Sequence, residues 1–397
     1  MDHKINRIIL PLLLLLNMSC SANSITKIKV GAEQTERYFP MIKAKRIALM
    51  VNQTSLSDTT HLVDLLANAK MDIKKIFAVE HGFRGKAANG IEFNDTVDTK
   101  TGLPIISLYG KKKKPSTADL SDVDVVIFDI QDVGCRFYTY GSSLFYLMEA
   151  CAENNIQMIV LDRPNPNGDY VDGPVLDLNL ESFVGLLPIP IVHGCTVGEL
   201  ALMINGEKWL ANQLSCTLEV ITVENYDHSM LYDLPVQPSP NLPNNRAVRL
   251  YPSLCFFEAT NVSIGRGTEF PFQLIGYPGC SLNEIEFKPQ TIEGISSHPI
   301  FEGERCTGVD LRSQDTVPQF TLSYFIEFAQ QFEDKNQFWK SKRWIELLSG
   351  TTEFYEQINR GESDETIRAT WKEGLKKYID LRQNYLLYPD FIPDASH

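Results

Sequence analysis

The chain has 397 residues, 43% of them hydrophobic and 10% aromatic, so it can form a large core and, by its length, two domains. Its net charge of −13 argues against binding to nucleic-acid phosphates and favours solubility or neutral partners. Its eight cysteines are spread singly with no C-x-x-C pair, which argues against a full disulfide framework.

Residues 1–20 have the pattern of a secretory signal peptide. Lys4 and Arg7 form a basic start, and residues 8–16 are apolar but too few to span a bilayer. Cys20 stands where a bacterial lipoprotein signal places its lipidated cysteine. We therefore expect an exported protein, either periplasmic or anchored to a membrane through a lipid on Cys20.

Six short apolar runs, each ending on polar residues, predict buried strands. They comprise residues 47–51, 76–79, 105–108, 125–128, 158–161 and 189–192. Continuous apolar runs are typical of parallel strands that are covered on both faces. Amphipathic helices are expected between them, at residues 62–70, 138–154 and 196–210. The alternation predicts an α/β domain with a parallel sheet, over residues 25–240.

The proline-rich stretch 234–243 predicts a stiff, extended connection to a second domain. Beyond it the pattern becomes mixed. Strands are expected at residues 255–257, 272–275, 285–287 and 319–322, and helices at residues 323–333 and 363–385. Residues 241–397 therefore predict a smaller α+β domain.

The sequence lacks the common cofactor and metal motifs. No G-x-G-x-x-G follows a strand, and neither a Walker A pattern, H-E-x-x-H nor G-x-S-x-G occurs. We therefore expect no cofactor and no metal. Ligands of open α/β sheets bind outside the carboxyl ends of the strands, so the polar residues at the six strand ends are the candidates for a site.

Glu80 is the sharpest candidate. It follows a strand and precedes glycines that would let the backbone approach a ligand, and in a partly apolar pocket it could act as a general acid. His81 could orient Glu80 or bind substrate. The alternative is that Glu80 pairs with Arg84 and only holds the loop.

The later strand ends carry further acids and bases. Arg136 could form a bidentate pair with Asp129 or Asp132, so catalysis and structural pairing both remain open for Asp129. Asp162 and Arg163, on a proline-stiffened loop, could grip a polar ligand or satisfy backbone groups.

His193 follows the sixth apolar run. A lone histidine at such a position is often simply hydrogen-bonded at the start of the following helix.

Seven blocks of the sequence together resemble one known family. They are residues 80–85, 101–110, 129–140, 162–168, 193–201, 238–243 and 257–268. They are similar to the blocks of exo-lytic β-N-acetylmuramidases, peptidoglycan hexosaminidases that release terminal N-acetylmuramic acid and were long catalogued as a bacterial domain of unknown function. The resemblance implies a Rossmann-like domain and a smaller auxiliary domain with the active cleft between them. It also points to Glu80 as the catalytic acid. Ala259 departs from the glycine expected in the last block, which bears on substrate preference.

Cleavage of a glycosidic bond needs a protonated carboxyl group and a second group that stabilises or attacks an oxocarbenium-like centre. Glu80 is our candidate acid, and Asp129, Asp132 and Glu258 are candidates for the second group. Arg136, Arg163 or Arg266 would hold the lactyl carboxylate of muramic acid, because a guanidinium matches a carboxylate bidentately. Further substrate contacts are expected from His81, Arg84, Tyr138, Asp162, Asn165, His193 and Asn241.

Two other function classes stay open. The same cleft could belong to an exported protein that binds muropeptides or sugars without turnover. An amidase or esterase acting on the same polymer would need an activated nucleophile or a metal, for which the sequence shows no good constellation.

Overall fold

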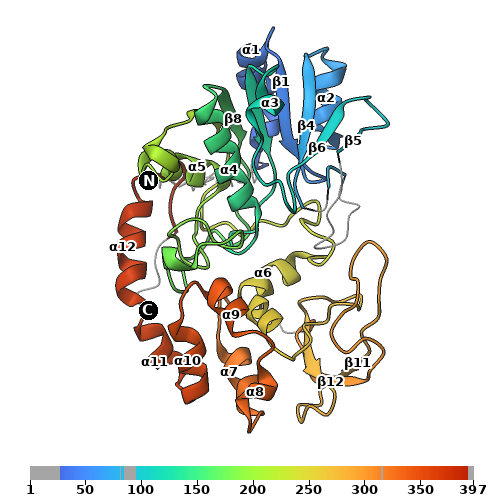
Figure 1. Ribbon diagram of the computed structural model, residues 1–397, viewed down its shortest axis with the longest axis vertical. Coiled ribbons are helices and arrows are strands. Elements are labelled where there is room, and N and C mark those ends of the chain that lie inside the picture. Colours follow the sequence, from blue (N-terminus) through green and yellow to red (C-terminus); the bar gives the residue numbers. More distant parts are fainter. Residues whose placement is uncertain (1–26, 81, 85–94, 314–315, 392–397) are drawn as a thin grey trace, which may run out of the picture.

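The computed structural model describes residues 27–80, 82–84, 95–313 and 316–391. The expected signal peptide, Cys20 and His81 lie outside these residues. Within them, no helix combines the length and the apolar character needed to cross a membrane. Figure 1 shows a first part built around a large sheet and a second part made mainly of helices with a small sheet.

A seven-stranded sheet forms the centre of the first part, in the order β5-β6-β4-β1-β7-β8-β9. Neighbouring strands are parallel, except that the edge strand β5 runs antiparallel to β6. The strands are β1 (Ile47–Val51), β4 (Ile73–Ala78), β5 (Thr96–Val97), β6 (Pro104–Ser107), β7 (Val125–Asp129), β8 (Gln157–Leu161) and β9 (Thr217–Ile221). Strands β2 (Leu56–Ser57) and β3 (Thr60–His61) form a separate small hairpin. The predicted α/β class is confirmed.

Helices cover both faces of this sheet, which explains why its central strand β1 is apolar throughout. Along β1, Leu49 belongs to a core shared with helices α1 (Thr35–Ile42) and α2 (Leu62–Asn68). Its neighbours Ala48 and Met50 belong to the core on the other face. That second face is covered by α3 (Thr117–Leu120), α4 (Tyr140–Glu153) and α5 (Val197–Gly206). Successive side chains of a strand point to opposite faces, so every side chain of β1 is buried against one core or the other.

One of the six predicted strands is wrong. Residues 189–192 form no regular strand, and Val192 makes only isolated bridges to Cys135 and Asp172. Pro190 lacks the backbone N–H that a sheet requires, which prevents a regular ladder. The seventh strand is instead β9, an edge strand whose exposed threonine and glutamate break the apolar pattern.

The second part contains an antiparallel sheet in the order β10-β12-β11. Its strands are β10 (Leu274–Tyr277), β11 (Ile285–Phe287) and β12 (Cys306–Asp310). Its helices are α6 (Asn245–Leu254), the 3₁₀ helix η4 (Cys255–Ala259), α7 (Ser323–Gln330), α8 (Lys335–Phe338), α9 (Lys342–Ser349), α10 (Glu353–Arg360), α11 (Asp364–Ala369) and α12 (Lys372–Arg382).

The secondary structure predicted for this part needs three corrections. Residues 255–257 are helical because they continue α6 directly into η4. Residues 319–322 lie in a loop, and the helix predicted over 363–385 is divided into α11 and α12.

The end of the chain returns to the first part, as Figure 1 shows for α12. The guanidinium of Arg382 donates to the carbonyl of Gly194 at 2.6 and 3.0 Å. Beyond α12, the hydroxyl of Tyr388 donates to Asp162 at 2.5 Å. One continuous hydrophobic core includes residues of both parts, so packing fixes their relative position.

Candidate active site

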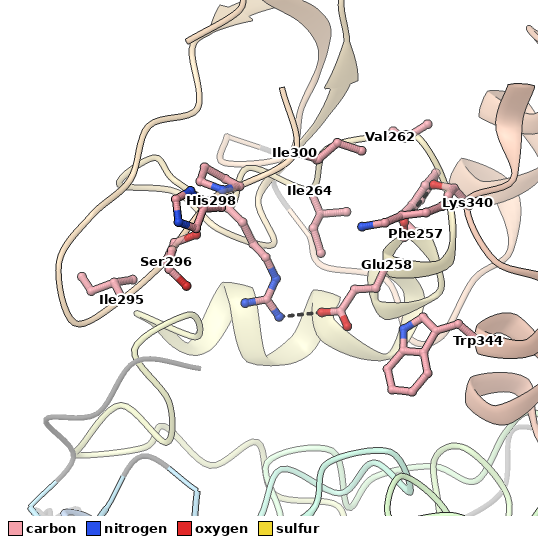
Figure 2. Close-up of a pocket in the computed structure, with 14 residues that line it drawn as sticks. Phe257, Glu258, Val262, Ile264, Ile295, Ser296, His298, Ile300, Lys340 and Trp344 are labelled. Atoms are coloured by element: carbon pink, nitrogen blue, oxygen red, sulfur yellow. Dashed lines mark hydrogen bonds and ion pairs between the residues drawn. The ribbon is translucent and has the colours of Figure 1, made fainter. Parts of the chain in front are cut away.

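A cleft with two adjoining chambers lies where the first part meets the second. The first chamber has a volume of about 280 Å³ and the second, drawn in Figure 2, about 240 Å³. Glu258, Arg266 and Trp344 line both chambers and therefore form the boundary between them. Glu80 lines the first chamber.

Glu80 is held at the carboxyl end of β4 by two hydroxyl groups. Tyr109 donates to its Oε1 at 2.8 Å and Thr139 donates to its Oε2 at 3.1 Å. Tyr109 follows β6, which pairs with β4, and Thr139 precedes α4. The parallel pairing thus brings these residues together, and the half-buried carboxyl group faces the chamber with both oxygens oriented.

Glu258 reaches the first chamber from the second part of the molecule. It lies on η4, and its Oε1 accepts a hydrogen bond from Nη2 of Arg266 at 2.5 Å. The Arg266 guanidinium also lies over the ring of Phe272, at 5.0 Å from the ring centroid. Of the four carboxyl groups predicted as catalytic, Glu80 and Glu258 line the same chamber.

Asp129 lies away from both chambers. It is fully buried at the end of β7, where its two oxygens accept hydrogen bonds from Nε and Nη2 of Arg163 at 2.6 and 3.0 Å. Arg163 also donates to the carbonyl of Leu56 at 2.9 Å. The alternative of structural pairing therefore describes Asp129, and Arg163 is engaged inside the protein.

Asp132 is also buried outside the two chambers, beside a small void that it shares with His193. Burial raises the pKa of Asp132 to about 7, although hydrogen bonds from the Gly134 and Val133 amides act to lower it. Burial, with help from nearby arginines, lowers the pKa of His193 to about 3. The two side chains are 3.9 Å apart, and since His193 is neutral near pH 7 the contact is not an ion pair. Nδ1 of His193 accepts from the amide of Cys195 at 3.2 Å, as expected for a histidine at a helix start.

Arg136 is not paired with a carboxylate. Its guanidinium donates to four backbone carbonyls, those of Pro174, Ile189, Leu348 and Ser349, at 2.7–2.9 Å. Burial without a counter-charge lowers its pKa to about 9. Because the last two carbonyls belong to α9, Arg136 joins the two parts of the molecule and is not free to bind a substrate.

Four other predicted substrate contacts also serve the protein interior. Asp162 accepts from Thr196 and from the Gly198 amide at the start of α5, and burial raises its pKa to about 6. The other three bond to backbone carbonyls: Tyr138 to Pro238, Asn165 to Cys195 and Asn241 to Ile295.

Arg84 does not pair with Glu80. It forms a forked ion pair with Asp98 at 3.0 and 3.1 Å and lies over the ring of Phe83. Because Asp98 lies on the following loop, this pair ties together two segments near the sheet edge. The alternative in which Glu80 pairs with Arg84 is therefore wrong, and Arg84, predicted as a substrate contact, is paired with Asp98.

Sequence reasoning missed several residues of the cleft. Tyr109 and Thr139 lie inside the family-like blocks 101–110 and 129–140. The position of Tyr109 after a predicted strand and of Thr139 at the start of a predicted helix could have indicated them. Lys340 and Trp344 had no local signal, since they lie in the far half of the chain outside every block.

Family models match both parts of the chain. The model described as exo-beta-N-acetylmuramidase NamZ, N-terminal, matches residues 47–246, and the corresponding C-terminal model matches residues 249–388. The chain is 37% identical over 374 residues to the peptidoglycan beta-N-acetylmuramidase NamZ of Bacillus subtilis, covering 88% of this chain and 89% of that protein.

Solved structures agree with this match. A DUF1343 family protein from Bacteroides fragilis superposes with a TM-score of 0.85 at 45% identity, over 92% of this chain and all of that one. A second DUF1343 protein from the same organism gives a TM-score of 0.80 at 29% identity, over 91% of this chain and 99% of that one.

Proposed function

Because the chain belongs to the exo-beta-N-acetylmuramidase NamZ family, we propose that it is a glycosidase that releases terminal N-acetylmuramic acid from peptidoglycan fragments. The relative from Bacillus subtilis is named for the same bond and polymer. The comparisons do not favour the alternative of an exported sugar-binding protein without turnover.

The observation that supports a chemical role for the cleft is the placement of Glu80 and Glu258 in one chamber. We assign Glu80 as the general acid that protonates the glycosidic oxygen. Its two hydroxyl partners, Tyr109 and Thr139, fix the direction of the carboxyl group. Transfer of a proton within the transition state requires such a fixed direction, because the donor must lie within hydrogen-bond reach of the leaving oxygen.

We assign Glu258 as the second group, which stabilises the positive charge that develops at the anomeric carbon. Its ion pair with Arg266 holds it in place at the chamber boundary. Asp129 and Asp132 are less suited to this role because both are buried away from the chamber. A carboxylate that faces the developing oxocarbenium ion lowers the barrier by electrostatic attraction in a site that largely excludes water.

The Glu80→Gln protein tests this assignment. Glutamine keeps the size of the side chain and can still bond to Tyr109, but it cannot donate a proton to a leaving alcohol. We expect kcat on the N-acetylmuramide of a poor leaving group to fall by about 10²–10⁴-fold. The matched control is Glu219→Gln, which removes an exposed carboxylate from the edge strand β9. Near-normal turnover by Glu80→Gln would exclude Glu80 as the acid.

We also propose that the protein is exported and carries a lipid on Cys20. The support is the sequence of residues 1–20, with its basic start, apolar segment and terminal cysteine. Cell fractionation checks it: recovery of the wild-type protein in the soluble fraction, without detergent, would contradict the lipid anchor.

A further inference from the structure

The second chamber combines an apolar wall, an aromatic ring and a cation. Val262 and Ile264 form part of its wall, and Trp344 separates it from the first chamber. Figure 2 shows Lys340 and Trp344 among the side chains around this chamber. An aromatic face beside apolar side chains suits the C–H face of a sugar ring, whereas the cation suits an anion.

Among the described residues that line the two chambers, Lys340 is the cation that remains available for a ligand. Arg266 is already paired with Glu258 at 2.5 Å. His298 lies 3.4 Å from Glu302, and its side chain is 90% exposed. Lys340 is also an exposed residue, but its ammonium has no ion pair or hydrogen bond with any residue in the described ranges, and its backbone amide is anchored to Ala259 at 2.9 Å.

Trp344 packs partly against the hydrophobic core, but its indole has no hydrogen-bond or aromatic partner within the described part of the chain. Among the described residues, its indole N–H donates no hydrogen bond and its ring packs against no other aromatic ring, whereas Trp339 donates to Asn359 and packs against the tilted ring of Tyr355. A half-buried tryptophan at the boundary of two chambers therefore offers an open ring face to whatever occupies them.

The arginines expected to hold the lactyl carboxylate are occupied elsewhere. Arg136 binds four carbonyls, Arg163 binds Asp129, and Arg266 is neutralised by Glu258. N-acetylmuramic acid differs from N-acetylglucosamine by a lactyl ether that ends in a carboxylate. An enzyme that selects the former therefore needs a cation at the edge of its sugar site.

We propose that Lys340 binds the lactyl carboxylate of the terminal N-acetylmuramic acid in the second chamber and determines the selection of this sugar, while the sugar ring lies against Trp344 with its glycosidic bond at Glu80. This inference rests on the proposed function and adds a specificity-determining residue to it. The lactyl arm crosses the boundary formed by Glu258 and Arg266.

Binding of free sugars, measured by isothermal titration calorimetry, tests the proposal without any turnover. The ligands are N-acetylmuramic acid and its neutral lactyl amide, and the proteins are wild type, Lys340→Met and Lys342→Met. Lys342 is the matched control, because it is a nearby exposed lysine that pairs with Glu356 and lines neither chamber.

We expect the wild-type protein to bind the acid about tenfold more tightly than the amide, the effect of one charge-assisted hydrogen bond. Lys340→Met should abolish this preference, and Lys342→Met should retain it. A preference that survives in Lys340→Met, or that is absent from the wild type, would overturn the proposal.

A stem peptide also carries a carboxylate that could bind Lys340. N-acetylmuramoyl-L-alanine, whose only carboxylate is that of the alanine, distinguishes the peptide from the lactyl group. We expect it to bind like the neutral amide, because its carboxylate lies one residue further out. Lys340-dependent binding as tight as that of the acid would assign the site to the peptide and refute the lactyl assignment. Since none of these measurements requires Glu80, failure of the catalytic assignment would leave their outcome unaffected.

Discussion

Replacing Asp129 by asparagine should destabilise the protein without removing its chemistry. Asp129 is fully buried and holds Arg163 through two hydrogen bonds of 2.6 and 3.0 Å. Asparagine keeps the shape of the side chain but carries no charge, so it leaves the buried guanidinium uncompensated. Removal of one partner from a buried ion pair typically costs about 3–5 kcal/mol.

Urea unfolding followed by circular dichroism measures this loss. With a slope of about 3 kcal/mol per M, a loss of 3–5 kcal/mol lowers the unfolding midpoint by about 1–2 M. The double variant Asp129→Leu/Arg163→Met removes both charges and should recover much of the stability, because apolar residues of similar volume can replace a buried pair.

Turnover of the same proteins distinguishes structure from catalysis. In buffer without urea, at a temperature well below that of unfolding, we expect kcat of Asp129→Asn to stay within a few-fold of the wild-type value. Glu80→Gln should show the reverse, an unchanged midpoint and a large loss of kcat. A wild-type midpoint combined with a loss of kcat of about 100-fold or more in Asp129→Asn would refute the structural assignment and return Asp129 to the catalytic machinery.

Two further predictions concern buried titratable groups. Burial raises the pKa of Asp132 from 3.8 to about 7, so between these pH values the folded state keeps a proton that the unfolded state releases. The wild type should therefore lose stability relative to Asp132→Asn as the pH rises from about 4 to 7. Urea midpoints at pH 4.5 and 7.5 measure this, and parallel pH profiles of the two proteins would contradict it. Arg136→Met leaves four buried carbonyls without a donor and should lower the free energy of unfolding by about 3 kcal/mol or more. Arg136→Lys should not restore the stability, because an ammonium cannot reproduce the planar array of donors of a guanidinium. An unfolding midpoint equal to that of the wild type in either Arg136 variant would show that these bonds contribute little.

The sequence alone predicted the sheet well because its strands are local and continuous. Five of the six apolar runs are strands of the central sheet, and the helix predicted from residue 196 is α5, which begins with a capping box of Thr196 and Glu199. Where the pattern failed, at residues 189–192, the apolar content was right but proline removed the donor that a strand needs.

The sequence also placed Glu80 correctly at a strand end, because ends of parallel strands share one edge of the sheet. The sequence could not show which of the acids at that edge are buried and which line the cleft. Asp129 ends β7 and Glu80 follows β4, yet Asp129 is buried in an ion pair with Arg163, whereas Glu80 lines the first chamber.

The tertiary structure alone decided the partners of the charged residues. Arg136 finds two of its four carbonyls more than two hundred positions away on α9. Glu258, Trp344 and Lys340 reach the cleft because the second part packs against the first. Backbone periodicity depends on neighbours along the chain, so it can be deduced from the sequence. The burial, pairing and pKa of a side chain depend on which distant segments pack around it, and only the folded arrangement fixes those.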